Sequence, residues 1–73
     1  MKEQIKAIMA RVFGLPEIED GISTATCDRW DSLRHLNLTI ELEMEMGVEF
    51  EPEEIAAMKS LDQIEAILLK KRS

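Results

Sequence analysis

Ser32 is the side chain whose type and surroundings point most directly to chemistry. It follows Asp31 at the start of a predicted helix, where free amide groups and the positive end of the helix dipole favour an anion. A phosphoester there would be stabilised by roughly 0.3 to 1 kcal/mol at an exposed position, which assists a modification without specifying it. An ordinary, unmodified first-turn serine is the alternative that these observations leave open.

A catalytic role for Ser32 would depend on His35, which lies three residues further along the same predicted helix and could touch it. No third orienting group or oxyanion loop is recognisable, and one small helical domain offers little cleft from which to exclude water. We therefore expect a protein without enzymatic activity. His35 is then a residue of the helix surface or of a pocket edge.

The remaining candidate ligands do not form a metal site. Residues 17–21 lack the alternating oxygen ligands and the closing glutamate of a calcium loop. The single cysteine, Cys27, cannot form an internal disulfide, and with one histidine it falls short of a zinc site. We interpret Cys27 as a partly buried small residue in a reducing compartment, with a reactive thiol as the alternative.

The first predicted helix repeats apolar residues at spacings of three and four, the pattern of one buried face. Gly14 ends it, and Pro16 prevents it from continuing. Residues 15–30 show no sustained period and form a long ordered loop, which is unusual in so small a domain and suggests a functional role. The helix face consists of Ile5, Ile8, Met9, Val12 and Phe13, and the loop anchors are Leu15, Ile18, Ile22 and Trp30.

Three further helices and no strand are predicted. The second, 31–46, is capped by Asp31 and is followed by a glycine. A short third helix, 52–58, opens on a proline with acidic residues around it. The last helix opens at Ser60, where Gln63 completes a capping box, and its apolar face is Leu61, Ile64, Ile67 and Leu68.

The second helix carries two apolar stripes on different faces. One consists of Leu38, Leu42 and Met46, and the other of Leu33, Leu36, Ile40 and Met44. A single helix in a domain of this size has difficulty burying both, so we expect one stripe to stay partly exposed as a docking surface. Flanking helices that bury both stripes are the alternative.

The composition indicates one folded domain, 1–73, because 45% of the residues are hydrophobic and 33% are charged. The net charge of -6 repels nucleic acid and anionic lipid. It would attract basic protein surfaces, and a solvated acidic face that serves solubility is the alternative. Lys2, Glu3 and Lys6 interrupt any signal peptide, and the longest apolar stretch, 66–69, is too short to cross a membrane. We expect a soluble, cytoplasmic monomer with neither nucleic acid nor membrane as a partner.

The run Asp31-Ser32-Leu33, at the start of a second helix after a long loop in a four-helix chain of this length, resembles the signature of acyl carrier proteins. The resemblance covers essentially the whole chain and implies an all-α four-helix bundle of acyl-carrier type, with a long first loop and a short third helix. In that family 4'-phosphopantetheine from coenzyme A is esterified to the serine, and its terminal thiol carries acyl intermediates as thioesters. Ser32 would be the attachment residue, and Asp31 the neighbour that the phosphopantetheinyl transferase recognises.

The resemblance also implies roles along the second helix. The residues expected to dock on acyl-transferring or condensing enzymes are Leu33, Leu36 and Ile40, and the acidic rim that basic enzyme patches recognise is Glu41, Glu43 and Glu45. The core positions, between which an acyl chain can enter in this family, are Leu38, Leu42 and Met46.

The chain departs from the family pattern in three places. Arg29 and Trp30 stand where carriers of fatty acid synthesis usually have a glycine and a small residue. Arg34 stands where an acid is common. The glycine pair that usually precedes the serine of peptidyl carriers is absent. The pathway, whether fatty acid, polyketide-like or another specialised acyl pathway, therefore stays open. The alternative function is an unmodified helical docking module that uses the Leu33/Leu36/Ile40 face.

Overall fold

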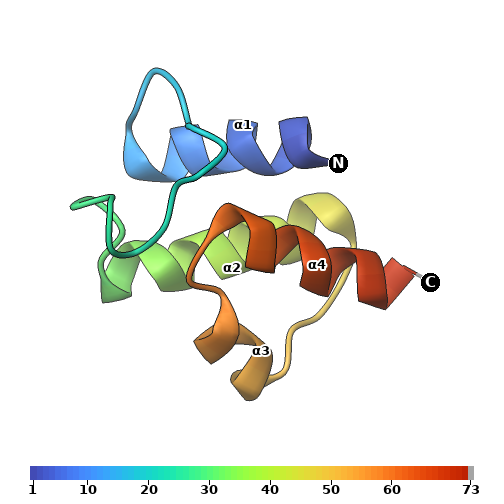
Figure 1. Ribbon diagram of the computed structural model, residues 1–73. Helices are drawn as coiled ribbons and strands as arrows, with labels where there is room; N and C mark the ends of the chain where they lie inside the picture. Colours follow the sequence, from blue (N-terminus) through green and yellow to red (C-terminus); the bar gives the residue numbers. More distant parts are fainter. Residues whose placement is uncertain (73) are drawn as a thin grey trace.

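Four helices and no strand form the regular structure of residues 1–72, which are the residues that the computed structural model describes (Figure 1). The helices are α1 (Lys2–Phe13), α2 (Ser32–Met46), α3 (Pro52–Ala57) and α4 (Leu61–Arg72). The predicted all-α class, the long first loop and the short third helix are confirmed. Ser73, the last residue of the predicted 1–73 domain, lies outside the described residues.

Local sequence signals set the ends of α1 and α2. Gly14 and Gly47 follow these helices in the left-handed conformation, with φ of 68° and 67°, which a side chain would strain. Asp31 caps α2 as predicted, because its Oδ1 accepts a hydrogen bond from the backbone N–H of Arg34 at 2.8 Å. The cap fixes Ser32 as the first residue of the helix.

The predicted capping box of α4 is only half formed. The Oγ of Ser60 accepts a hydrogen bond from the backbone N–H of Gln63 at 3.1 Å, as a cap should. The Oε1 of Gln63, however, accepts from the backbone N–H of Lys59 at 3.0 Å and not from Ser60. The long loop binds the same connection, because the N–H of Thr24 donates to the oxygen of Lys59 and the N–H of Leu61 donates to the oxygen of Ile22.

Three helices and the long loop enclose one apolar core. α1 runs opposite to α2 and α4 and packs against both, while α3 lies below them (Figure 1). The core residues are Ile5, Ile8, Met9, Phe13, Ile18, Ile22, Trp30, Leu38, Leu42, Phe50, Met58, Leu61, Ile64 and Leu68. Four residues expected in the core are only partly buried against it, namely Val12, Leu15, Met46 and Ile67.

The long loop is held to α1 and to the connection between α3 and α4. The guanidinium of Arg29 donates a hydrogen bond to the backbone oxygen of Phe13 at 3.2 Å, which satisfies a carbonyl at the end of α1. Ser23 forms an isolated antiparallel bridge with Ser60, and the backbone N–H of Thr24 donates to the oxygen of Lys59 at 2.9 Å. The loop therefore fixes the start of α2 relative to both neighbouring segments.

The two stripes of α2 differ in burial, and this generates a stability prediction. Leu38 is 0% exposed, whereas Leu36 on the same helix is 53% exposed. We expect Leu38→Ala to lower the free energy of unfolding by about 2–5 kcal/mol, since it leaves a cavity. Leu36→Ala, the matched control, should change it by about 0.5 kcal/mol or less. Urea unfolding measures both values, and equal losses would contradict the burial described here.

Candidate functional site

Ser32 is exposed at the N-terminus of α2, as the sequence predicted. The neighbouring carboxylate of Asp31 is held on both oxygens: Oδ1 accepts from the backbone N–H of Arg34, and Oδ2 accepts from its guanidinium, each at 2.8 Å. The hydrogen bond from the Arg34 backbone lowers the pKa of Asp31 below its ordinary value, and the guanidinium charge acts in the same direction. Asp31 and Arg34 neutralise each other beside Ser32, so a negative group on the serine would not face an unpaired carboxylate.

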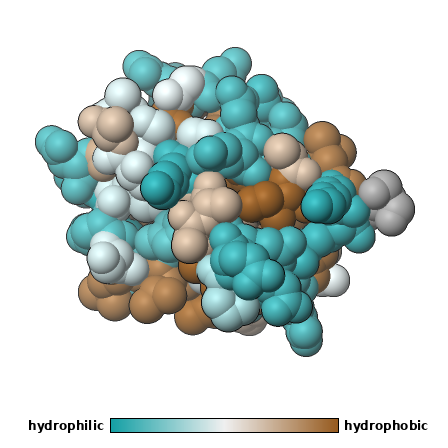
Figure 2. Space-filling view, turned by 60° about the horizontal axis from the view of Figure 1, so that its bottom comes forward, coloured by the Kyte–Doolittle hydropathy of each residue, from teal (hydrophilic) through white to brown (hydrophobic). Residues whose placement is uncertain are grey.

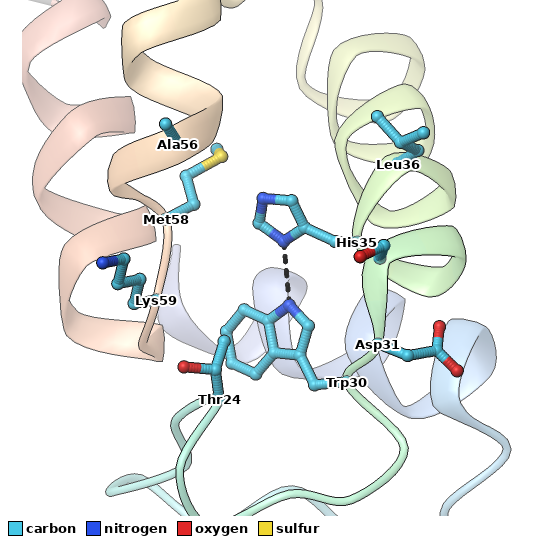
Figure 3. Close-up of a pocket in the computed structure, with 9 residues that line it drawn as sticks. Thr24, Trp30, Asp31, His35, Leu36, Ala56, Met58 and Lys59 are labelled. Carbon is cyan, nitrogen blue, oxygen red and sulfur yellow. Dashed lines mark hydrogen bonds between the residues drawn. The ribbon is translucent and has the colours of Figure 1, made fainter.

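An open groove of about 410 Å³ lies beside Ser32 (Figure 3). Its walls come from the long loop, from the first turns of α2, and from α3 with the segment that follows it. The lining residues are Thr24, Trp30, Asp31, Ser32, His35, Leu36, Ala56, Met58 and Lys59. The carboxylate of Asp31 points away from the middle of the groove, where the ring of His35 lies. The groove therefore offers an apolar surface next to the serine.

His35 connects Trp30 to α3 through two hydrogen bonds. The indole Nε1–H of Trp30 donates to Nδ1 of His35 at 2.9 Å, and Nε2 of His35 lies 2.8 Å from the backbone oxygen of Ile55. Because Nδ1 must accept, the proton of the neutral ring belongs on Nε2, from which it can be donated to the carbonyl. We call this arrangement the Trp30–His35–Ile55 bridge. It joins the end of the loop, α2 and α3.

The Trp30–His35–Ile55 bridge is the part of the site that the sequence did not reveal. His35 was expected at a helix surface or pocket edge, and it does line the groove, but its bond to a carbonyl twenty residues away has no local sequence signal. The bridge also gives a reason for Trp30, one of the departures from the acyl-carrier pattern. Trp30 fills the core, with its ring 5.4 Å from that of Phe13, and its polar N–H needs a partner there.

The second apolar stripe of α2 is exposed. The exposed fractions are 69% for Leu33, 53% for Leu36, 52% for Ile40 and 74% for Met44. The alternative that neighbouring helices bury both faces is therefore wrong. Figure 2 shows hydrophobic side chains reaching the surface between hydrophilic ones on the face that it presents. A contiguous apolar stripe of this kind is typical of an interaction surface.

The three acids predicted to rim this stripe all have partners within the chain. Glu41 and Glu45 both accept from the Nη2 of Arg11 on α1, at 3.1 and 2.9 Å. Glu43 accepts from the backbone N–H of Phe50 at 2.9 Å. These acids therefore hold α2 to its neighbours, and Arg11 offsets part of their charge.

Two of the three residues predicted to surround an acyl chain belong to the buried core, and the third borders it. Leu38 and Leu42 are 0% exposed, and Met46 packs against the core while staying partly exposed. They line neither the groove beside Ser32, nor the hollow at Cys27 and Arg29, nor the hollow between Arg11 and Ile40. The predicted core position is therefore confirmed for Leu38 and Leu42, whereas Met46 only borders the core. Entry of an acyl chain between these residues stays a prediction.

The described residues contain no group of three or more histidine, cysteine, aspartate or glutamate side chains that could hold a metal ion. Cys27 is a free, partly buried cysteine, as expected. No helix in residues 1–72 combines the length and the apolar character needed to cross a membrane.

Comparison with protein-family models, curated proteins and solved structures gave no match to this chain. The class of the protein therefore comes from the structure itself. It is a small all-helical protein whose described residues form four helices and no strand.

The lowered pKa of Asp31 generates a pH-dependent prediction. A carboxylate whose folded-state pKa lies below its unfolded value contributes stability above the unfolded pKa and loses it as the pH falls through the folded pKa. Asp31→Asn keeps a capping side chain but removes the charge. We expect the variant to unfold more easily than wild type at about pH 7, with the difference vanishing well below the ordinary aspartate pKa of 3.8.

Urea unfolding across this pH range measures the difference between wild type and Asp31→Asn. The effect should also shrink at high salt, since Asp31 and Arg34 are partly exposed. A difference that persists unchanged at acid pH would contradict the charge interaction.

Proposed function

We propose that this protein is an acyl carrier that bears 4'-phosphopantetheine on Ser32. The observation that carries the proposal is that Ser32 is exposed in the first turn of α2, within Asp31-Ser32-Leu33, at the edge of an apolar groove and on the helix that carries the exposed stripe. A transferase needs an accessible hydroxyl, and the arm needs a surface along which it can lie.

The electrostatics of the helix start support a phosphoester at this position. The first-turn amide groups and the helix dipole favour negative charge. The Asp31 carboxylate, which would repel a phosphate, is paired with the Arg34 guanidinium at 2.8 Å. In this proposal the Ser32 Oγ forms the new bond to phosphorus, and the nucleotide part of coenzyme A leaves.

The function proposed is carriage without catalysis. The thiol at the end of the arm holds an acyl group as a thioester, and α2 presents it to acyl-transferring or condensing enzymes through Leu33, Leu36 and Ile40. A flexible tether raises the local concentration of the acyl group at each active site to about the millimolar range, so weak docking is sufficient. We place this carrier in the reducing cytoplasm, acting as a monomer and having neither nucleic acid nor membrane as a partner.

A second candidate function is an unmodified docking module. The exposure of the whole stripe, from Leu33 to Met44, favours it, because a binding surface of this kind does not require a hydroxyl beside it. Under this alternative Ser32 is an ordinary first-turn residue, and its loss leaves the function intact.

Loading of Ser32 is the direct test of the proposed function. We expect intact-protein mass spectrometry, after incubation with coenzyme A and a broad-specificity phosphopantetheinyl transferase, to show the gain of one phosphopantetheinyl group. Ser32→Ala should gain none while remaining folded, and Ser23→Ala, a serine in the loop, should load like wild type. If folded wild type gains nothing with several such transferases, the docking module becomes the better account.

The exposed stripe generates a second prediction, with the transferase as the partner. Ile40→Ser should lower the kcat/KM for loading roughly fivefold or more, since a central apolar contact is lost. Leu69→Ser on α4 is the matched control, because Leu69 is 54% exposed against 52% for Ile40. Both variants should keep wild-type stability. Equal loading by the two variants would argue against docking through α2.

A further inference from the structure

The groove beside Ser32 ends on the Trp30–His35–Ile55 bridge. In Figure 3 the ring of His35 lies between α2 and the segment of Met58 and Lys59, with Trp30 directly below it. Nδ1 of His35 is held by Trp30 at 2.9 Å and Nε2 by the oxygen of Ile55 at 2.8 Å. The ring is therefore tied to both walls of the groove.

Trp30 is part of the buried apolar core. Trp30 is 6% exposed and packs on Phe13, with ring centroids 5.4 Å apart. Met58, Leu38 and Leu61 are each 0% exposed. An alkyl chain that started at Ser32 and ran toward this part of the core would meet the rings of His35 and Trp30, which line the groove.

Displacing His35 would be unfavourable for a specific reason. The indole N–H of Trp30 and the two ring nitrogens of His35 would lose their partners in a partly buried place, and an unpaired polar group there costs free energy. The neutral ring also fits in only one tautomer, since Nδ1 must accept from Trp30 while Nε2 donates to the Ile55 carbonyl. Both bonds must therefore break for the groove floor to open.

We propose that His35 is a positioning residue that holds Trp30 across the floor of the groove and keeps the cargo outside the helical core. This inference rests on the proposed carrier function. If the core stays closed in this way, the acyl groups that the protein carries are short or polar ones, which can lie in the open groove or in water. A long alkyl chain left outside would expose apolar surface to water, so the site disfavours it.

The bridge can be tested first on the unmodified protein. At about pH 8, where an ordinary imidazole is neutral, nitrogen-15 NMR of the His35 ring should show the proton on Nε2. The indole N–H of Trp30 should exchange slowly with water and should exchange faster in His35→Phe, which keeps a ring but cannot accept. Observation of the proton on Nδ1, or of fast exchange in wild type, would overturn the proposal.

The cargo class is tested on protein loaded with butyryl, octanoyl or lauroyl phosphopantetheine from the matching acyl coenzyme A. Hydroxylamine attacks the thioester carbonyl and breaks the carbon–sulfur bond, giving a hydroxamate and a free thiol. In wild type we expect cleavage rates within about twofold of one another. Protection of the lauroyl thioester by about tenfold or more in wild type would overturn the inference.

Two variants assign the effect to His35. In His35→Leu the hydrogen bonds that hold Trp30 in place are lost, so the lauroyl chain should reach the core and its thioester should be cleaved more slowly than the butyryl thioester. Asn37→Ala on the same helix should behave like wild type. Equal rates for all chain lengths in His35→Leu would overturn the role given to His35. If wild type does not load at all, the proposed function fails. The NMR measurement then still shows whether the hydrogen bonds of the Trp30–His35–Ile55 bridge are formed.

Discussion

The burial of Trp30 is the constraint on which the rest of the structure depends. Its ring packs against Phe13 of α1, and its N–H binds His35 of α2, which in turn binds the backbone of α3 at Ile55. Trp30 lies near the end of the long loop between α1 and α2, and together with His35 it connects three helices. A large aromatic group can do this only if its single polar atom is satisfied, which is why the histidine accompanies it.

The helices could be predicted from the sequence because their ends depend on neighbouring residues. Gly14, Asp31 and Pro52 act on the backbone within one turn, and the buried face of α1 is set by its own periodicity. The exposure of the α2 stripe followed from a related argument, since one helix carried more apolar surface than a small domain could cover. Burial of both stripes by flanking helices was the open alternative, and the structure decides against it.

The interactions that the sequence did not predict join residues far apart in the chain. Arg11 of α1 lies across the helix interface and forms ion pairs with Glu41 and Glu45 of α2, thirty and thirty-four residues further along the chain. His35 likewise binds a backbone carbonyl, a group that every residue possesses and that no sequence pattern marks. The bonds of the long loop to the connection before α4 are also of this kind, since they join the backbone of Thr24 to that of Lys59 and the backbone of Ile22 to that of Leu61. Periodicity and capping rules describe neighbours along the chain, and these contacts are decided by packing.

Trp30 is also the one tryptophan of the chain, and it lies at the floor of the groove beside Ser32 with its ring 6.1 Å from that of His35. The intrinsic ultraviolet emission of the protein therefore comes from a single chromophore in the place where cargo, partner or arm would arrive. The wavelength and intensity of this emission depend on contact of the indole with water and on its hydrogen bond to His35. The molecule therefore contains its own optical sensor of the groove. No external dye would be needed to follow events there in real time.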